Sequence, residues 1–279
     1  FNKIKMWCLF SLSFYVPQTA WIRILMQKHS QMLGDDWIVD RYITEKVEGM
    51  NPDTRYPIYF QKPLHGFQDG GICKYQALYQ SPSMRYIMRM FQGDPWFREV
   101  TMKIEIGNIC EELCLNPTVI DIGCGTGDST LIANQVLKLK RKCPNVIGVD
   151  LSPYMVEVAK LCTDLNFVQA NAARLDMFED DSVDLITSFA LFHEMPRRYS
   201  ICVLNEAYRL LKPGGRLLIW DQKVTVQSAT TQACKGAPSI EPFLLSYSQL
   251  NITKWMMSKN MTHIEHSEEK FMQFWTARL

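Results

Sequence analysis

The chain has 279 residues, of which 47% are hydrophobic and 21% are charged, and its formal net charge at pH 7 is +1. This length suits one large domain with extensions, and the composition excludes a chain that is disordered throughout. The balanced charge gives no support for a nucleic-acid partner.

The first 34 residues contain Lys and Arg but no Asp or Glu. This composition is typical of an organelle transit peptide, and the alternative is an ordinary helix packed on the body of the protein. The apolar run 6–16 ends at Pro17 and is too short to cross a bilayer, so we expect no transmembrane span. Residues 1–34 could contact a protein partner, a membrane surface or the protein itself. A helix is expected after Thr19.

Residues 51–83 are rich in Tyr, Phe, Gly and Pro, and they predict an ordered aromatic loop that leads into a short helix. Residues 95–117 predict a second helix that ends at Pro117. Its expected apolar face consists of Phe97, Val100, Ile104 and either Cys110 or Leu113. We therefore expect an N-terminal extension over residues 1–96 and a second domain over residues 97–279.

From residue 118 onwards, short β-branched runs alternate with helical runs. Strands are expected at 118–122, 145–150, 166–170, 182–189 and 215–221, and helices at 128–142, 152–165 and 197–211. This alternation predicts a parallel, doubly wound α/β sheet that is covered by helices on both faces. Residues 261–279 contain two further strand-like runs, which predict an antiparallel hairpin at the edge of the sheet.

The nine cysteines are scattered along the chain without paired short spacings. Cys110 and Cys114 are four residues apart, but no second pair or nearby histidine completes a zinc site. We therefore expect reduced thiols and no metal.

The stretch "TVIDIGCGTGDST" (118–130) is a strand that enters a helix through a turn with three glycines. In a doubly wound sheet, ligands bind beyond the carboxyl ends of the strands. A phosphate-binding P-loop needs a lysine after its last glycine, whereas Asp128 stands there. The dinucleotide motif G-x-G-x-x-G fails at the same residue. The turn therefore favours neither a triphosphate nor a pyrophosphate.

An amino-acid moiety fits the turn better, because it carries both an anion and a cation. Backbone N–H groups can bind its carboxylate, while Asp121 or Asp128 can accept hydrogen bonds from its ammonium group, directly or through water. S-adenosylmethionine contains such a moiety. At these residues the chain resembles class I S-adenosylmethionine-dependent methyltransferases of the type 11-like group, whose first motif D-x-G-x-G-x-G reads "DIGCGTG" here. The resemblance covers residues 97–279, and it implies a mostly parallel seven-stranded Rossmann-like sheet.

The resemblance also implies a set of cofactor contacts. Asp150 ends the second strand, where it can accept hydrogen bonds from both ribose hydroxyls; the alternative role of helix cap is better filled by Ser152 before Pro153. Asn171 stands where the family often has an acid against the adenine amine, or it closes its own Asx turn. The full expected set is Asp121, Gly123, Cys124, Gly125, Gly127, Asp128, Asp150, Leu151, Asn171, Ala172 and Phe189.

The sequence "LFHEM" after the fourth strand supplies the candidate catalytic residues. His193 could act as a base near neutral pH with Glu194 orienting it, or it could simply pack at the pocket wall. His65, in the aromatic segment, is a more distant candidate for the same role.

The aromatic segment itself resembles a methyltransferase subgroup of photosynthetic organisms, which implies a plastid more than a mitochondrion. The sequence leaves two alternative functions for the whole chain. The first is an active methyltransferase with a small-molecule acceptor, and the alternative is a silent subunit of a larger organellar assembly.

Overall fold

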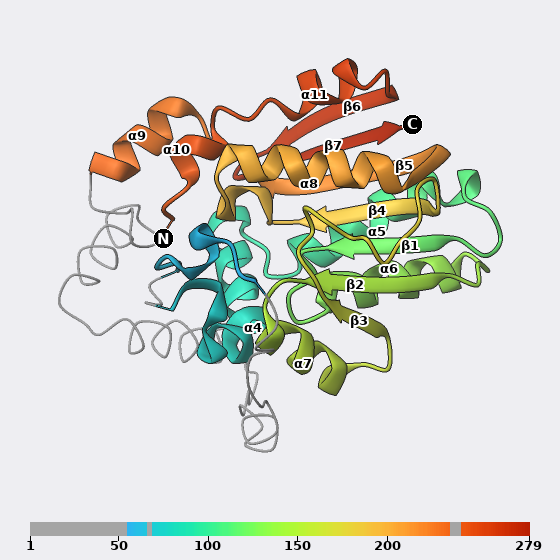
Figure 1. Cartoon of the computed structure of the whole chain (residues 1–279), viewed down its shortest axis with the longest axis horizontal. Coiled ribbons are helices and arrows are strands. Elements are labelled where there is room, and N and C mark those ends of the chain that lie inside the picture. Colours follow the sequence, from blue (N-terminus) through green and yellow to red (C-terminus); the bar gives the residue numbers. More distant parts are fainter. Residues whose placement is uncertain (1–54, 66–68, 235–240) are drawn as a thin grey trace.

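The structure is a computed structural model that describes residues 55–65, 69–234 and 241–279 (Figure 1). The helix expected after Thr19 and the contacts expected of residues 1–34 lie outside these ranges. None of the helices within them is both long enough and apolar enough to cross a membrane.

The core is a seven-stranded sheet in the order β3-β2-β1-β4-β5-β7-β6. The first five strands pair in parallel, whereas β7 pairs antiparallel with both β5 and β6. Both the predicted doubly wound sheet and the predicted terminal hairpin are thereby confirmed. The strands are β1 (Thr118–Ile122), β2 (Asn145–Asp150), β3 (Asn166–Gln169), β4 (Val183–Phe189), β5 (Leu211–Gln222), β6 (Thr262–Glu269) and β7 (Met272–Arg278).

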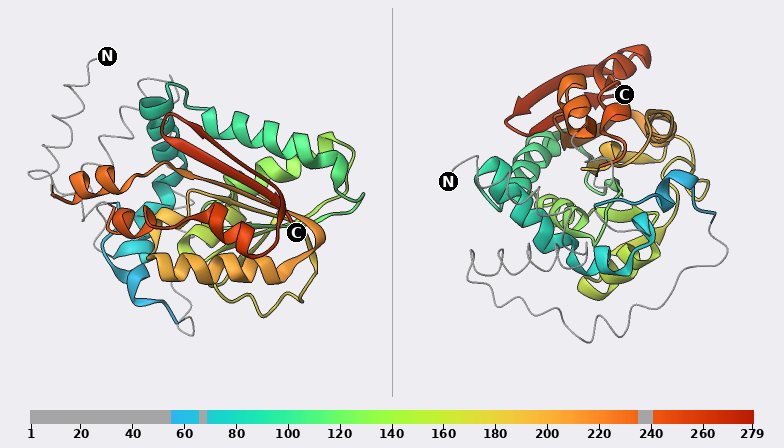
Figure 2. Two further views of the ribbon diagram at one scale, coloured as in Figure 1. Left: turned by 90° about the horizontal axis from the view of Figure 1, so that it is seen from above. Right: turned by 90° about the vertical axis from the view of Figure 1, so that its left-hand side faces the viewer.

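Helices cover both faces of this sheet, as Figure 2 shows for α5 and α8. The α-helices are α4 (Lys74–Gln92), α5 (Phe97–Ile109), α6 (Asp128–Leu139), α7 (Pro153–Cys162), α8 (Arg197–Leu210), α9 (Val226–Cys234), α10 (Leu244–Tyr247) and α11 (Ile252–Ser258). The 3-10 turns are η1 (Ile58–Gln61), η2 (Gly70–Ile72), η3 (Cys110–Glu112) and η4 (Phe192–Glu194).

Alternating strand residues form two separate apolar layers. Val119 and Leu185 pack with α5 and α6, whereas their neighbours Ile120 and Ile186 pack with α8 and α11. Successive side chains of a strand point to opposite faces, so strands buried on both faces are apolar at nearly every position. This double burial explains the continuous apolar runs in the sequence.

Two predictions about the helices before the sheet need correction. The short helix expected after the aromatic loop is the 19-residue helix α4, which packs against α7. The predicted apolar face of α5 is wrong at Val100 and Ile104, which are 48% and 54% exposed, whereas Phe97, Cys110 and Leu113 pack in the core as expected. The buried face carries Met102 and Ile106 instead, both fully buried against the sheet. The expected domain boundary at residue 97 coincides with the start of α5 and stays a proposal.

Candidate active site

The glycine turn joins β1 to α6 at the carboxyl edge of the sheet. Gly123 and Cys124 donate their N–H groups to Val149 O at 2.8 and 3.1 Å, which fixes the turn against β2. All three glycines of the turn have positive φ. A Cβ at Gly125 would lie 2.2 Å from Gln80 Oε1, and one at Gly127 would lie 2.7 Å from the ring of Phe167. Glycine is therefore required both by the backbone angles and by the close neighbours.

Asp150 lies beside this turn at the end of β2. Its Oδ2 accepts the N–H of Gly125 at 2.9 Å, and its Oδ1 accepts the N–H of Ser152 at 2.8 Å. Burial raises the pKa of this carboxyl to about 6, although the two backbone hydrogen bonds oppose the shift. Ser152 caps α7 by accepting from Met155 N, and Pro153 fills the first turn as expected. Each Asp150 oxygen keeps acceptor capacity for a ligand.

Asp121 does not line the pocket, and its predicted contact with the ammonium group, directly or through water, stays a proposal. The side chain is fully buried, and it accepts hydrogen bonds from the hydroxyls of Ser129, Thr130 and Thr187 at 2.6, 2.7 and 2.9 Å. Burial raises the pKa of this carboxyl, and the three hydroxyls oppose that shift. Asp121 therefore supports the start of α6 from behind the turn.

Asp128 lines the pocket, but it is already paired. Arg98 Nη2 of α5 lies 2.9 Å from Asp128 Oδ2, and the hydroxyl of Ser81 donates to the same oxygen. Because Arg98 brings a positive charge next to this carboxylate, an ammonium group is disfavoured there. The predicted ammonium contact at Asp128 stays a proposal.

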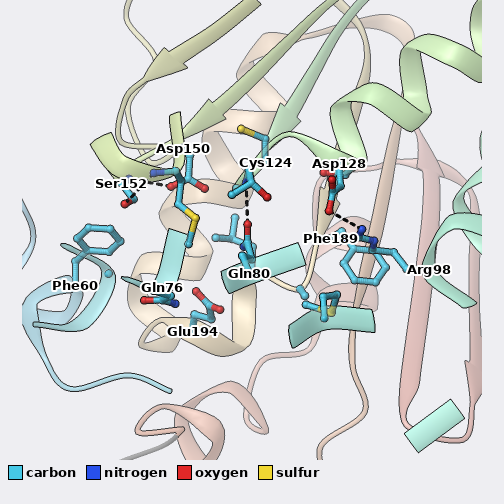
Figure 3. A pocket seen from close by; sticks show the side chains of 18 residues that line it. Phe60, Gln76, Gln80, Arg98, Cys124, Asp128, Asp150, Ser152, Phe189 and Glu194 are labelled. Atoms are coloured by element: carbon cyan, nitrogen blue, oxygen red, sulfur yellow. Dashed lines mark hydrogen bonds and ion pairs between the residues drawn. The ribbon is translucent and has the colours of Figure 1, made fainter. Parts of the chain in front are cut away.

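The pocket lies where the turn, Asp150 and the end of β4 meet, and Figure 3 shows its side chains. Of the expected cofactor residues, those that line it are Gly123, Cys124, Asp128, Asp150 and Phe189. Gly125 and Gly127 shape the turn without lining the pocket. Phe60, Gln76, Gln80 and Met84 close it from the segment before the core.

Three further expected cofactor residues, like Asp121, Gly125 and Gly127, lie outside the lining. Asn171 Oδ1 accepts the N–H of Ala173 at 3.0 Å, which is the Asx turn considered as the alternative role. Leu151 accepts Gln169 Nε2 through its carbonyl at 3.3 Å, and Ala172 packs against the α8 side of the core. The contact of Asn171 with adenine and the contacts of Leu151 and Ala172 with the cofactor stay predictions.

His193 and Glu194 lie in η4, just after β4, but in different surroundings. Glu194 lines the pocket, whereas His193 is only 7% exposed. His193 Nδ1 is hydrogen-bonded to Asp221 Oδ1 at a distance of 2.6 Å. Burial alone would lower the pKa of His193, but Asp221, Glu241 and Glu194 outweigh it and raise that pKa to about 10. The orienting carboxylate is therefore Asp221 instead of Glu194, and a cationic imidazole is a poor base near neutral pH.

Sequence reasoning missed several residues of the site. Asp221 ends β5, and the rule that the carboxyl ends of parallel strands share an edge could have found it. Gln80 accepts the N–H of Thr126 at 2.8 Å, and Arg98 holds Asp128. No pattern in the sequence marks these last two, because only the packing of α4 and α5 brings them to the turn.

Comparisons with known proteins agree with this geometry. Residues 120–219 match the family described as "Methyltransferase domain". A demethylmenaquinone methyltransferase of Lactococcus lactis subsp. lactis (strain IL1403) is 34% identical over 141 residues, which are 48% of this chain and 51% of that protein. The ubiquinone/menaquinone biosynthesis C-methyltransferase UbiE of Bartonella tribocorum is 37% identical over 107 residues, which are 36% and 39% of the two chains. The chain thus spans about half, or less, of the length of these relatives.

A solved structure supports the fold alone. The magnesium protoporphyrin IX methyltransferase of Synechocystis PCC 6803, with bound SAH, aligns with a TM-score of 0.50 at 15% identity. The alignment covers 65% of this chain and 82% of that one. The glycine turn, the order of the strands and the matched region together show that the chain carries a class I S-adenosylmethionine-dependent methyltransferase domain.

Proposed function

We propose that the protein transfers a methyl group from S-adenosylmethionine to a small-molecule acceptor. The observation that carries this proposal is the position of Asp150 and the glycine turn in one pocket, at the carboxyl ends of β1 and β2. The N–H groups from Gly123 to Gly127 already have acceptors, so the carboxylate of the cofactor would take the N–H of Thr126 in place of Gln80 Oε1. Asp150 would accept hydrogen bonds from the ribose. The other expected cofactor contacts belong to the same proposal.

Methyl transfer from a sulfonium is an in-line displacement. The acceptor atom forms a bond to the methyl carbon as the bond from that carbon to sulfur breaks, which leaves S-adenosylhomocysteine and releases a proton from the acceptor. Placing the two reacting atoms about 3–3.5 Å apart supplies much of the rate. The enclosing wall formed by Phe60, Met84 and Phe189 would provide this placement and exclude water.

We further propose a hydroxylated aromatic ring of the quinol class as the acceptor, methylated at carbon. The names of the two relatives support this class, since both act in quinone biosynthesis or on a demethylated quinone. Aromatic side chains on the pocket wall suit a flat ring. Glu194 would accept a hydrogen bond from a ring hydroxyl, and it is the residue we assign to direct contact with the acceptor. The cationic His193 would support catalysis from behind by stabilising the charge of Glu194.

The alternative of a silent subunit is not favoured, because the matching relatives are named as enzymes. A partner or membrane surface for residues 1–34 concerns a segment outside the described ranges, and a plastid location depends on the resemblance of the aromatic segment. They stay predictions from the sequence.

The acceptor is tested by incubating the protein with S-adenosylmethionine and reduced naphthoquinols that lack a ring methyl group. We expect S-adenosylhomocysteine and a ring-methylated product, both detected by mass spectrometry. Glu194→Gln should lower kcat about 10- to 100-fold, as for a lost hydrogen bond to a charged group, and leave S-adenosylhomocysteine affinity unchanged. Asp176→Asn, an exposed change, is the matched control. Product methylated only at oxygen, or a variant as fast as wild type, would contradict the proposal.

A further inference from the structure

A cluster of imidazole and carboxylate groups lies at the Glu194 end of the pocket. It joins His65 from the aromatic segment, His193 and Glu194 from η4, and Glu241 from the segment before α10. We propose that these four side chains bind one divalent transition-metal cation, such as Zn²⁺ or Mn²⁺. This site goes beyond the proposed function, because a cation can bind here without any methyl donor.

The distances between the candidate ligand atoms suit one ion. His65 Nε2 lies 3.5 Å from Glu194 Oε1 and 3.2 Å from Glu241 Oε1. One ligand atom from each of His65, His193 and Glu194 lies within 4.8 Å of the others. Tetrahedral zinc bonds of about 2.0–2.1 Å place neighbouring ligands about 3.3 Å apart. Small side-chain shifts would therefore bring His65, His193 and Glu194 onto one ion, and Glu241, which contacts His65, would turn toward the ion to complete the set.

Both histidines are oriented through their other ring nitrogen. His193 Nδ1 lies 2.6 Å from Asp221 Oδ1, and Asp221 is itself held by the N–H groups of Phe192 and Gln222. His65 Nδ1 lies 3.0 Å from the amide nitrogen Nε2 of Gln76, whose Oε1 has no partner. Turning this amide over would place Oε1 at Nδ1 as the acceptor of a ring N–H and leave Nε2 of His65 for an ion. An acceptor behind each imidazole is the arrangement that commonly supports metal-binding histidines.

Polar atoms around the cluster lack partners. Glu241 Oε2 and Gln76 Oε1 are buried and have no hydrogen-bond partner among the described residues. Glu194, Glu241 and Asp221 also bring three carboxylates against two imidazoles. Buried carboxylates are stable when they are paired or when they bind a cation. A divalent cation would satisfy the free Glu241 oxygen and balance the negative charge.

The sequence did not suggest this site, and our expectation of no metal rested on the spacing of cysteines. The four ligands lie at positions 65, 193, 194 and 241, so no short motif contains them. Their chemistry, two nitrogens and two carboxylates, suits a borderline cation better than Mg²⁺ or Ca²⁺, which prefer oxygen alone. Because Glu194 also lines the pocket, the ion would lie next to the acceptor and could polarise an acceptor oxygen.

The test is titration of the chelator-treated full chain with Mn²⁺ alone, followed by electron paramagnetic resonance of the free ion. Mn²⁺ is chosen because exposed thiols, such as Cys114 and Cys202, would bind Zn²⁺. We expect one Mn²⁺ per chain, which excess Zn²⁺ displaces. His65→Gln and Glu241→Gln should each weaken binding at least tenfold, and Asp221→Asn about 10- to 100-fold through its hold on His193.

His266→Gln serves as the control, since this histidine lies on β6 outside the cluster. Circular dichroism establishes that each variant is folded. Substitutions at His65 and Glu241 disturb folding least, because both side chains are partly exposed. Absence of a stoichiometric site, or equal affinity in the His65, Glu241 and wild-type proteins, would show a hydrogen-bonded cluster only and overturn the proposal. A parallel titration with S-adenosylhomocysteine separates this failure from failure of the proposed function.

Discussion

Asp150 combines two properties in one side chain, a raised pKa and a place at the end of β2. The ionised carboxylate can accept hydrogen bonds from both ribose hydroxyls of the proposed cofactor, whereas the protonated form loses acceptor capacity. Cofactor binding should therefore favour the ionised form. Since burial raises the Asp150 pKa to about 6, the ionised fraction grows as pH rises through that value.

We predict that the affinity for S-adenosylhomocysteine increases about tenfold between pH 5 and pH 7, following the ionised fraction of one group with a pKa near 6. Calorimetric titration at a series of pH values measures this dependence. Asp150→Asn removes the titrating group and should give weaker, pH-independent binding. Equal affinity of the wild-type chain at pH 5 and pH 7 would contradict the role of Asp150.

Asp121 should matter for stability more than for binding. It is fully buried and accepts hydrogen bonds from three hydroxyl groups of α6 and β4. Without Asp121 these hydroxyl groups would be buried without an acceptor. We predict that Asp121→Ala lowers the free energy of unfolding by about 2–4 kcal/mol. Urea denaturation measures the change, with the exposed Asp164→Ala as control. A loss below about 0.5 kcal/mol would be inconsistent with a supporting role.

At the scale of elements, α5 shows how the sequence of a helix can predict the wrong buried face. Its sequence has apolar residues on both sides, Val100 and Ile104 on one, Met102 and Ile106 on the other. Helical spacing alone cannot choose between these faces, because the choice depends on the sheet residues across from them. In the structure the second set meets Val119 and Leu185.

This correction predicts different costs for two neighbouring substitutions. Met102→Ala removes a fully buried side chain and should cost about 2–5 kcal/mol of unfolding free energy. Val100→Ala, at a position that is 48% exposed, should change it by no more than about 0.5 kcal/mol. Thermal or urea unfolding of the two variants compares them directly. A larger loss for Val100→Ala than for Met102→Ala would restore the face expected from the sequence.

Helix α4 brings Gln80 onto the glycine turn, where its Oε1 takes the N–H of Thr126. The carboxylate of the proposed cofactor seeks the same kind of donor, so Gln80 competes with it. We predict that Gln80→Ala tightens S-adenosylhomocysteine binding about 2- to 10-fold, the worth of one ordinary hydrogen bond. Gln92→Ala, farther along the same helix, is the matched control for α4. Weaker binding by Gln80→Ala would instead show that Gln80 helps to hold the cofactor.

For the whole molecule, the sequence predicted the features that local chemistry determines. Apolar runs that alternate with helical runs predicted the sheet, because strands buried on both faces are apolar at nearly every position. Two further strand-like runs at 261–279 predicted the terminal hairpin. The glycines were informative because positive φ and close contact both exclude a side chain at the turn.

The rest of the site depends on contacts between distant segments. The orienting partner of His193 lies 28 residues away at Asp221, and Gln80 reaches the turn across 46 residues. Neither pair has a fixed spacing that a single sequence could reveal. The raised pKa of His193 likewise comes from Asp221, Glu241 and Glu194 together, which only the folded chain assembles.

The central claim is that this pocket binds S-adenosylmethionine through the glycine turn and Asp150. Calorimetric titration of S-adenosylmethionine and S-adenosylhomocysteine into the folded chain, with Asp150→Ala beside wild type, tests it most directly. The account predicts saturable binding that Asp150→Ala weakens by about 1–3 kcal/mol, as expected for loss of a charged hydrogen bond. No binding by the folded wild-type chain, or equal binding by Asp150→Ala, would contradict the account.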